Sequence, residues 1–201
     1  MADTTIESID ALLPQTQCTR CGYPRCRDYA EAIAQGKADI NRCPPGDDTT
    51  IRALSELLGR PPAILDPDCG PHGPRQRAVI DEDTCIGCRK CIDACPVDAI
   101  VGSRQFMHTV IAADCTGCEL CLPPCPVDCI RLVPQPVAGN RWPEYREGEV
   151  SRWRNLTAQH FNRLARKRKR RTYQRGKSIF PDRETIRTDI QAAIARRRSH
   201  R

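Results

Sequence analysis

The chain has 201 residues, enough for one domain of ordinary size or two small ones, and its net charge is +7. Only 4% of the residues are aromatic but 14 are cysteine, so bound groups are expected to supplement a thin apolar core. No apolar run of about 18 residues encodes a membrane-spanning helix, and the first residues lack the features of a secretory signal. We therefore expect a cytoplasmic protein whose reduced cysteines bind metal rather than form disulfides.

Residues 1–60 are expected to form a small helical domain around four cysteines. Apolar spacing predicts a short first helix that includes Ile6 and Ile9, and two more helices over about 26–35 and 49–58. The four cysteines follow the spacing C-x2-C-x4-C-x16-C, namely Cys18, Cys21, Cys26 and Cys43. Three thiolates in a loop and a distant fourth suit either a 4Fe–4S cluster or a structural zinc ion. We favour the cluster because ferredoxin-type motifs follow.

A linker rich in proline and glycine spans residues 61–76. The next segment, residues 77–135, contains the pattern C-x2-C-x2-C-x3-C-P twice, with an offset of 30 residues. Short apolar pieces before, between and after the two copies predict small paired strands. We expect two loop-and-helix units related by a pseudo-twofold axis. Gly87 and Gly117, between ligands, would let the backbone approach a bound cluster closely.

This repeated pattern predicts two 4Fe–4S clusters with crossed ligands. Three closely spaced thiolates reach one cluster, and the fourth, which precedes proline, ligates the other. The first ligand set is then Cys85, Cys88, Cys91 and Cys125. The second ligand set is Cys95, Cys115, Cys118 and Cys121. Two zinc ions are the alternative, although three ligands within seven residues are unusual for one ion.

Three further residues invite a functional interpretation. Cys129 aligns with Ala99 of the first copy, so it is not needed as a ligand and is expected to be a buried free thiol beside a cluster. Cys69 lies in the linker and is expected to be a spare surface thiol. His108 lies between the two copies, and we assign it a structural role and no site.

Residues 136–201 form a basic extension without cysteine. Residues 137–201 contain 19 Lys and Arg against 6 Asp and Glu, whereas residues 1–136 contain 13 against 19. Helices are expected over about 151–171, which includes the run Arg166-Lys-Arg-Lys-Arg-Arg171, and from about Asp182 to Arg197. A basic helix could contact an anionic membrane or a protein partner, or fold back on the acidic body. No base-reading motif accompanies the basic run, so we do not expect a nucleic-acid partner.

Both cysteine arrays resemble those of one known family. The segment from Thr16 to Cys26, followed by Cys43-Pro44-Pro45-Gly46, resembles the N-terminal 4Fe–4S domain of the B subunit of the Rnf (Rsx) electron transport complex. The repeat, with Met107-His108-Thr109-Val110 between its two copies, is similar to the same protein. The resemblance covers about residues 5–135. Family members usually begin with a hydrophobic membrane-anchoring helix, so we expect a variant that lacks this anchor and carries a basic C-terminal extension.

The sequence thus predicts an α+β protein: a helical 4Fe–4S domain, a ferredoxin-like domain with two 4Fe–4S clusters, and a helical or partly disordered basic tail. It contains no glycine-rich nucleotide loop, flavin motif or catalytic pair, which favours a non-catalytic electron carrier or an electron-transfer subunit with three 4Fe–4S clusters. The resemblance implies redox partners such as a ferredoxin, a flavoprotein or other subunits of the complex. It also implies peripheral contact with the cytoplasmic face of the inner membrane. A redox-sensing regulator, the reducing subunit of a larger oxidoreductase and a zinc-bound adaptor are the alternatives.

Overall fold

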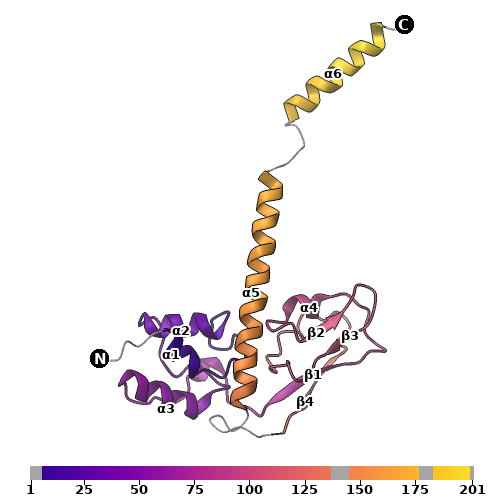
Figure 1. Ribbon diagram of the computed structural model, residues 1–201. Coiled ribbons are helices and arrows are strands. Elements are labelled where there is room, and N and C mark those ends of the chain that lie inside the picture. Colours follow the sequence, from indigo (N-terminus) through magenta and orange to yellow (C-terminus); the bar gives the residue numbers. More distant parts are fainter. Residues whose placement is uncertain (1–5, 137–144, 177–182, 200–201) are drawn as a thin grey trace. The chain divides into compact units, whose positions relative to one another are not determined.

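The computed structural model describes residues 6–136, 145–176 and 183–199. They belong to two compact units, Met1–His160 and Phe161–Arg201. The first unit contains two modules, one of helices and one with short strands, and the described residues of the second unit are helical (Figure 1). Asp182, the expected start of the last helix, lies outside the described residues.

Three helices form the N-terminal module. They are α1 (Ile6–Ala11), α2 (Cys26–Ala34) and α3 (Asp47–Leu58), and they confirm the three helices expected from the apolar spacing. The apolar face of each helix meets the others in one core, which includes the fully buried side chains of Ile9, Leu13, Ile33, Ile51 and Leu54. Removing each such side chain from water contributes about 1.5–3 kcal/mol, so this small core alone stabilises the module only modestly.

The repeat folds into two small antiparallel sheets. Strand β1 (Gln76–Ile80) pairs with β4 (Ile130–Pro134), and β2 (Ile100–Gly102) pairs with β3 (His108–Val110). The register places Ala78 opposite Leu132 and Gly102 opposite His108. Adding 30 to Ala78 gives His108, and adding 30 to Gly102 gives Leu132. The pairing therefore has the expected pseudo-twofold symmetry.

The symmetry fails at one helix. The first copy contains the short helix α4 (Lys90–Ala94), whereas the equivalent residues 120–124 form turns. Pro123 and Pro124 occupy the end of that segment, and proline lacks the N–H group that a helix requires. The expected helix of the second copy is therefore wrong. A short 3-10 helix, η1 (Pro67–Cys69), lies in the linker before the first strand.

Helix α5 (Glu147–Gly176) begins inside the first unit. Trp153 is fully buried and belongs, with Val150 and Tyr145, to the core of the strand module. The guanidinium of Arg75, just before β1, lies 5.1 Å from the centre of the Trp153 ring and donates hydrogen bonds of 2.8 and 2.9 Å to the carboxylate of Glu149. The first turns of α5 are thus part of the folded body.

Helix α5 also pairs with acidic residues of both modules. Arg154 forms an ion pair of 2.8 Å with Asp10 at the end of α1, and Arg152 pairs with Asp114 in the repeat. His160 Nδ1 lies 2.9 Å from Asp98 in the loop after the first cysteine motif. A single helix therefore contacts the N-terminal module and the strand module together.

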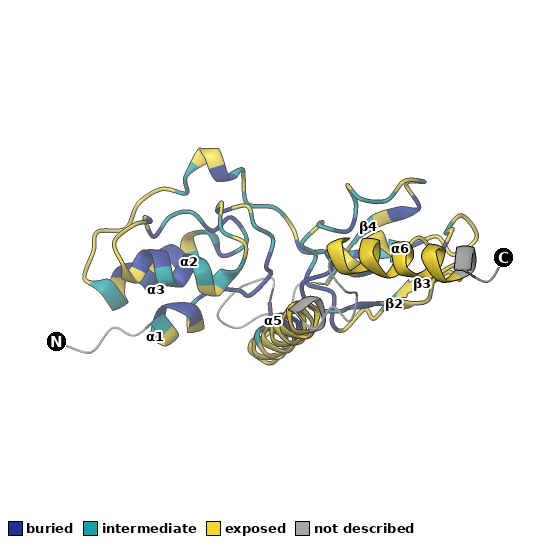
Figure 2. Ribbon diagram, turned by 90° about the horizontal axis from the view of Figure 1, so that it is seen from above, coloured by how far each residue is buried: buried dark blue, intermediate teal, exposed yellow. Residues whose placement is uncertain are grey.

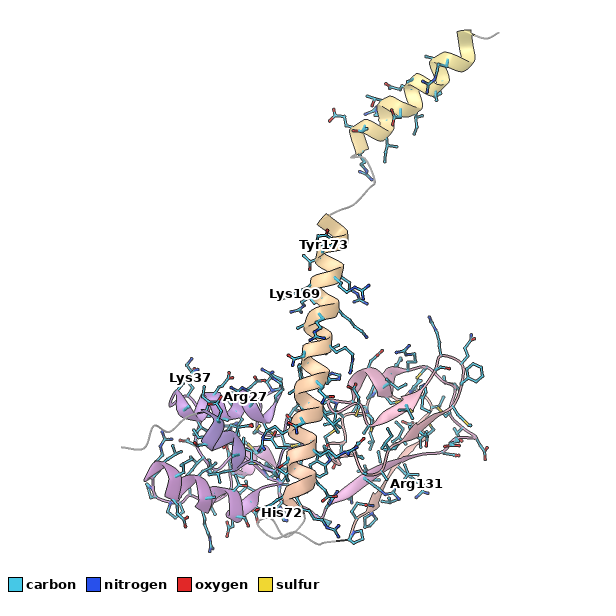
Figure 3. All side chains as sticks on the ribbon, viewed as in Figure 1. Arg27, Lys37, His72, Arg131, Lys169 and Tyr173 are labelled. Carbon is cyan, nitrogen blue, oxygen red and sulfur yellow. The ribbon has the colours of Figure 1, made fainter. Side chains whose placement is uncertain are left out.

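In the second unit, the described side chains of the rest of α5 and of α6 (Arg183–Ser199) are exposed, apart from the half-buried Phe161 (Figure 2). Lys169 and Tyr173 lie on this part of α5 (Figure 3). Both helices overlap the segments in which the sequence predicts helix. None of the helices described here has the length and apolar composition needed to cross a membrane.

Candidate metal centres

Cysteines from both copies of the repeat meet around one cavity. It has an empty volume of about 350 Å³ and is lined by Cys95 of the first copy together with Cys115, Cys118 and Cys121 of the second. Ala78, Val97, Ile100 and Leu132 complete an apolar wall around the thiols. The structure thus brings together the second predicted ligand set. Four thiols around an apolar space fit a 4Fe–4S cluster, which is held by four thiolates.

The first predicted set is linked through two further residues. Cys85 and Cys91 both contact His108: the His108 backbone N–H donates to Cys85 Sγ at 3.4 Å, and Nδ1 of the ring lies 3.2 Å from Cys91 Sγ. Cys125 Sγ lies 3.5 Å from Cys129 Sγ. Cys88, the remaining member, is exposed. This set therefore lies nearer to the surface than the second one.

The N-terminal array also surrounds a cavity. Cys18, Cys21, Cys26 and Cys43 line a space with an empty volume of about 300 Å³, together with Leu13, Tyr29 and two prolines. The loop that carries Cys18 is held by buried glutamines: Gln15 donates to the Asp10 carboxylate, Gln17 donates to Gln15, and Gln17 accepts from the Cys26 backbone N–H at 2.9 Å. This network fixes the cysteine loop against α1 and α2, and the four thiols line one cavity.

Burial sets the proton affinity of these thiols. It raises the pKa of Cys21 and Cys91 to about 11, and that of Cys118 and Cys121 to about 12. It also raises the pKa of Cys26 and Cys43 well above that of an ordinary thiol. Because a metal–sulfur ligand must be a thiolate, metal binding at these cavities has to release protons.

In the described part of the chain, no three His, Cys, Asp or Glu side chains are arranged to hold a single metal ion.

Cys125 and Cys129 form a pair with opposite shifts. Burial by itself would raise the pKa of Cys125, but hydrogen bonds from backbone N–H groups and from Cys129 outweigh it and lower that pKa. Burial, followed by the hydrogen bond to Cys125, raises the pKa of Cys129 to about 12. As expected, Cys129 is buried and lies beside a predicted ligand, with 3.5 Å between its Sγ atom and that of Cys125.

One sequence-based expectation needs correction. Cys69 is buried rather than a surface thiol, because η1 is held on the N-terminal module. Asp66 at the start of η1 pairs with Arg42 at 3.2 Å, and the Asp66 backbone N–H donates to the carbonyl oxygen of Asn41 at 2.9 Å.

Gly87 and Gly117 serve close packing of the chain on itself: a Cβ atom at Gly87 would lie 2.5 Å from the backbone nitrogen of Phe106, and one at Gly117 would lie 2.2 Å from the carbonyl oxygen of Gln76. Both glycines also have positive φ angles, 67° and 73°. The glycines therefore fix each cysteine loop on a neighbouring segment of the chain.

One open cavity has walls from both modules. Its empty volume is about 1090 Å³, and it is lined by Cys18 and Arg20 of the N-terminal array and by Gly117 and Cys118 of the repeat. Arg75 and Tyr145, which contact the first turns of α5, line the same cavity. Ligand loops of the N-terminal array and of the second ferredoxin-type set thus face a common space.

Comparisons with known proteins agree with this geometry. A family model described as a 4Fe-4S dicluster domain matches residues 78–132, and one described as "Putative Fe-S cluster" matches residues 13–45. The chain is 58% identical over 138 residues to the B subunit of the ion-translocating oxidoreductase complex of Alkalilimnicola ehrlichii, which covers 68% of this chain and 74% of that protein. It is 60% identical over 137 residues to the B subunit of Hahella chejuensis, covering 68% and 69%.

A shorter match has higher identity. The chain is 63% identical over 106 residues to the B subunit of Thiobacillus denitrificans, covering 53% of this chain and 56% of that protein. The match to the B subunit of an Azoarcus species covers 60% of that protein, so in both cases less than two thirds of the relative is spanned. The fold and the cysteine cavities define an iron–sulfur electron-transfer protein. The chain belongs to the family of the B subunits of ion-translocating oxidoreductase complexes, which confirms its resemblance to the Rnf family.

Proposed function

We propose that the chain relays single electrons through three 4Fe–4S clusters. The proposed ligands of the N-terminal cluster are Cys18, Cys21, Cys26 and Cys43. Those of the first ferredoxin-type cluster are Cys85, Cys88, Cys91 and Cys125, and those of the second are Cys95, Cys115, Cys118 and Cys121. The observation that supports this proposal best is that Cys95 shares one cavity with three cysteines of the other copy, as crossed ligation requires.

The residues around the cavities have roles that suit electron transfer. A 4Fe–4S cluster, when bound, supplies a carrier for one electron. Backbone N–H groups donate to ligand sulfurs, as Ala99 does to Cys95 at 3.2 Å, and such bonds stabilise negative charge on sulfur. Apolar side chains such as Val97 and Ile100 exclude water from the thiols. This role requires neither a general base nor a nucleophile.

We infer that electrons pass between the modules near Cys18 and Cys118. Both residues line the same open cavity, and one is a proposed ligand in each module. The contacts of Arg154 with Asp10 and of Arg152 with Asp114 join α5 to both modules, which supports a fixed spacing between their clusters. The N-terminal cluster and the second ferredoxin-type cluster are then neighbours in the relay.

The proposed partners are other subunits of an ion-translocating oxidoreductase complex, together with a ferredoxin or a flavoprotein. Residues 1–160 contain 17 Lys and Arg against 22 Asp and Glu, and bound clusters add negative charge, which favours partners with a positive docking surface. For the second unit we propose peripheral contact with an anionic membrane on the cytoplasmic side. Its support is the basic run from Arg166 to Arg171 on the exposed part of α5.

The test of the relay is the content of iron, zinc and acid-labile sulfide per chain, in protein purified without oxygen. We expect about twelve irons and twelve sulfides, four of each for every cluster. About eight irons with one zinc would make the N-terminal array a structural site. Zinc without sulfide would reject the proposed relay and leave an adaptor protein.

A single substitution tests the separate ligand sets. Cys21→Ser is expected to abolish one cluster signal in electron paramagnetic resonance (EPR) spectra of the reduced protein and to preserve the two ferredoxin-type signals. Cys69→Ser is the matched control, because Cys69 is also a buried cysteine near this array but is not a proposed ligand. Loss of all three signals in Cys21→Ser would contradict independent sets.

A further inference from the structure

Equivalent backbone hydrogen bonds are made to the two ferredoxin-type ligand sets. The N–H of Ala78 donates to Cys115 Sγ at 3.4 Å, and the N–H of His108, its counterpart 30 residues later, donates to Cys85 Sγ at 3.4 Å. Backbone hydrogen bonds of this kind stabilise the negative charge of a cluster and raise its reduction potential. Since the same bond is present in both halves, it gives neither cluster an advantage.

The side chains at this pair of positions break the symmetry. Ala78 offers only a methyl group, whereas the imidazole Nδ1 of His108 lies 3.2 Å from Cys91 Sγ. A metal-bound thiolate has lone pairs and no proton, so the histidine nitrogen must be the donor in this contact. The His108 side chain is 1% exposed, and its Nε2 atom has no hydrogen-bond partner among the described residues. Burying an unpaired nitrogen costs free energy, which a purely structural role would not require.

The fold makes room for this histidine. Gly102 lies opposite His108 in the β2–β3 pair, and a Cβ atom at Gly102 would lie 2.4 Å from Cδ2 of the imidazole. In the other half the sizes are reversed, with Leu132 opposite Ala78. The backbone of Gly102, with φ at 149°, is also one that other residues rarely adopt. Sequence and register together therefore favour an imidazole on one side of the pseudo-twofold axis.

A second asymmetric donor contacts the same ligand set. Cys129 occupies the position of Ala99 in the other half, and its Sγ lies 3.5 Å from Sγ of Cys125. When Cys125 is a metal-bound thiolate, the S–H of Cys129 is the only possible donor in this contact. The side chains of His108 and Cys129 thus reach two of the four proposed ligands of one cluster, Cys91 and Cys125.

We propose that His108 and Cys129 are positioned donors that hold the reduction potential of the cluster at Cys85, Cys88, Cys91 and Cys125 above that of the second ferredoxin-type cluster. This inference rests on the proposed three-cluster relay. The reduced form of a cluster carries one more negative charge than the oxidised form, so added donors stabilise it preferentially. Solvent exposure also raises the reduction potential of the first cluster, because its ligand Cys88 is exposed whereas the counterpart Cys118 is half-buried.

The consequence is a direction within the ferredoxin module. The proposed ligand Cys118 of the second ferredoxin-type cluster lines the cavity shared with the N-terminal array. An electron on this second cluster would pass to the first ferredoxin-type cluster. The second cluster would then be oxidised by one electron and the first reduced by one electron. No proton is exchanged in this step. The electron then rests on the cluster near the exposed Cys88, on the surface available to an acceptor.

The test is a redox titration of the full chain followed by EPR, with iron and sulfide content measured on the same samples. His108→Leu removes the donor, and His108→Asn retains a donor near the position of Nδ1. We expect His108→Leu to lower the higher of the two ferredoxin-type potentials by about 59 mV, a tenfold change in the reduction equilibrium of a one-electron couple. His108→Asn should keep this potential close to its wild-type value, and Cys129→Ala should lower the same potential.

Cys69→Ala is the matched control for Cys129→Ala, and it should leave both ferredoxin-type potentials unchanged. If His108→Leu fails to fold, the comparison of Cys129→Ala with Cys69→Ala still tests whether a side-chain donor raises the potential of one ferredoxin-type cluster. Full iron and sulfide content with no shift, or an equal shift of both potentials, would overturn this inference and leave the relay intact. A wild-type chain without four irons and four sulfides per ligand set would instead reject the relay.

Discussion

The two compact units differ in how their residues are stabilised. Residues 1–160 contain all 14 cysteines and two buried cores, and they have a net charge of −5 from 17 basic and 22 acidic residues. Residues 161–201 contain no cysteine and have 15 basic and 3 acidic residues, a net charge of +12, and nearly all their described side chains are exposed. Helix α5 belongs to both units, with the boundary after His160.

This difference shows that one continuous helix can serve two physical purposes. Its first turns are fixed by Trp153, by the ion pair of Arg75 with Glu149 and by contacts with both modules. In its later turns the described side chains are exposed, apart from the half-buried Phe161, and residues 166–171 are all basic. The first part should therefore respond to changes in packing, and the second to salt and anionic surfaces.

The largest effect should come from removing iron. Cysteines are part of both buried cores, so bound metal would link the segments that form these cores. We expect chelation to unfold residues 1–160 and to expose Trp153. In a Trp142→Phe background, the fluorescence maximum of the remaining tryptophan should shift to longer wavelength. A maximum that stays at short wavelength would show that the apolar cores suffice.

Trp153→Ala should produce the next largest effect. Truncating a fully buried tryptophan costs about 3–5 kcal/mol, because it removes apolar contact and leaves a cavity. Leu164→Ala, on the exposed part of the same helix, should change stability by less than about 0.5 kcal/mol. Thermal unfolding without oxygen measures both, and equal effects would contradict the boundary after His160.

Glu149→Gln should have a smaller effect that depends on pH. Although burial opposes it, hydrogen bonding from Arg75 holds the pKa of Glu149 below its ordinary value of 4.5. A lowered pKa in the folded state means that the ionised carboxylate contributes stability above pH 4.5 and loses that contribution as the pH falls through the folded-state pKa. Losing this charged hydrogen bond should cost about 1.5–3 kcal/mol at pH 7.

The difference in melting temperature between wild type and Glu149→Gln should therefore be constant from pH 6 to 8 and shrink under acid. Glu147→Gln, on the same turn of α5, is the control, because it removes a nearby carboxylate and leaves the ion pair of Arg75 with Glu149 in place. A difference that grows on acidification would show that the carboxylate is not stabilised by Arg75.

The smallest effect on stability is expected from replacing the six basic residues at 166–171 with glutamine. These side chains are exposed, so the free energy of unfolding should change by less than about 0.5 kcal/mol. Binding to vesicles that contain phosphatidylserine should nevertheless fall, since each basic residue near an anionic surface contributes about 1 kcal/mol. Unchanged vesicle binding, measured by sedimentation, would reject the proposed membrane contact of the tail.

Much of the architecture could be predicted from local sequence. The helices α1, α2 and α3 follow from apolar spacing, and α3 ends at Gly59 in the left-handed conformation that glycine favours. The pseudo-twofold pairing follows from the offset of 30 residues. The missing helix of the second copy could also have been found, because Pro123 and Pro124 stand in its last turn.

Other features depend on contacts between distant residues. The burial of Cys69 depends on how η1 packs, and the spacing of cysteines does not reveal it. The role of His108 depends on the register that places it beside Cys91 and opposite Gly102. The pairing of Arg154 with Asp10 joins residues 144 positions apart, and neither residue has a local signal that would predict the contact.

The sequence by itself determined the family, the cysteine ligands proposed for each cluster and the division of charge along the chain. These properties are encoded locally, because ligand spacing within a loop and runs of like charge need no knowledge of the rest of the fold. Only the tertiary structure decided where the body ends, which cavities the cysteines of the two copies share and which cluster receives extra donors. Such properties arise when side chains far apart in sequence exclude water together, and burial and hydrogen bonding then depend on the packed neighbours.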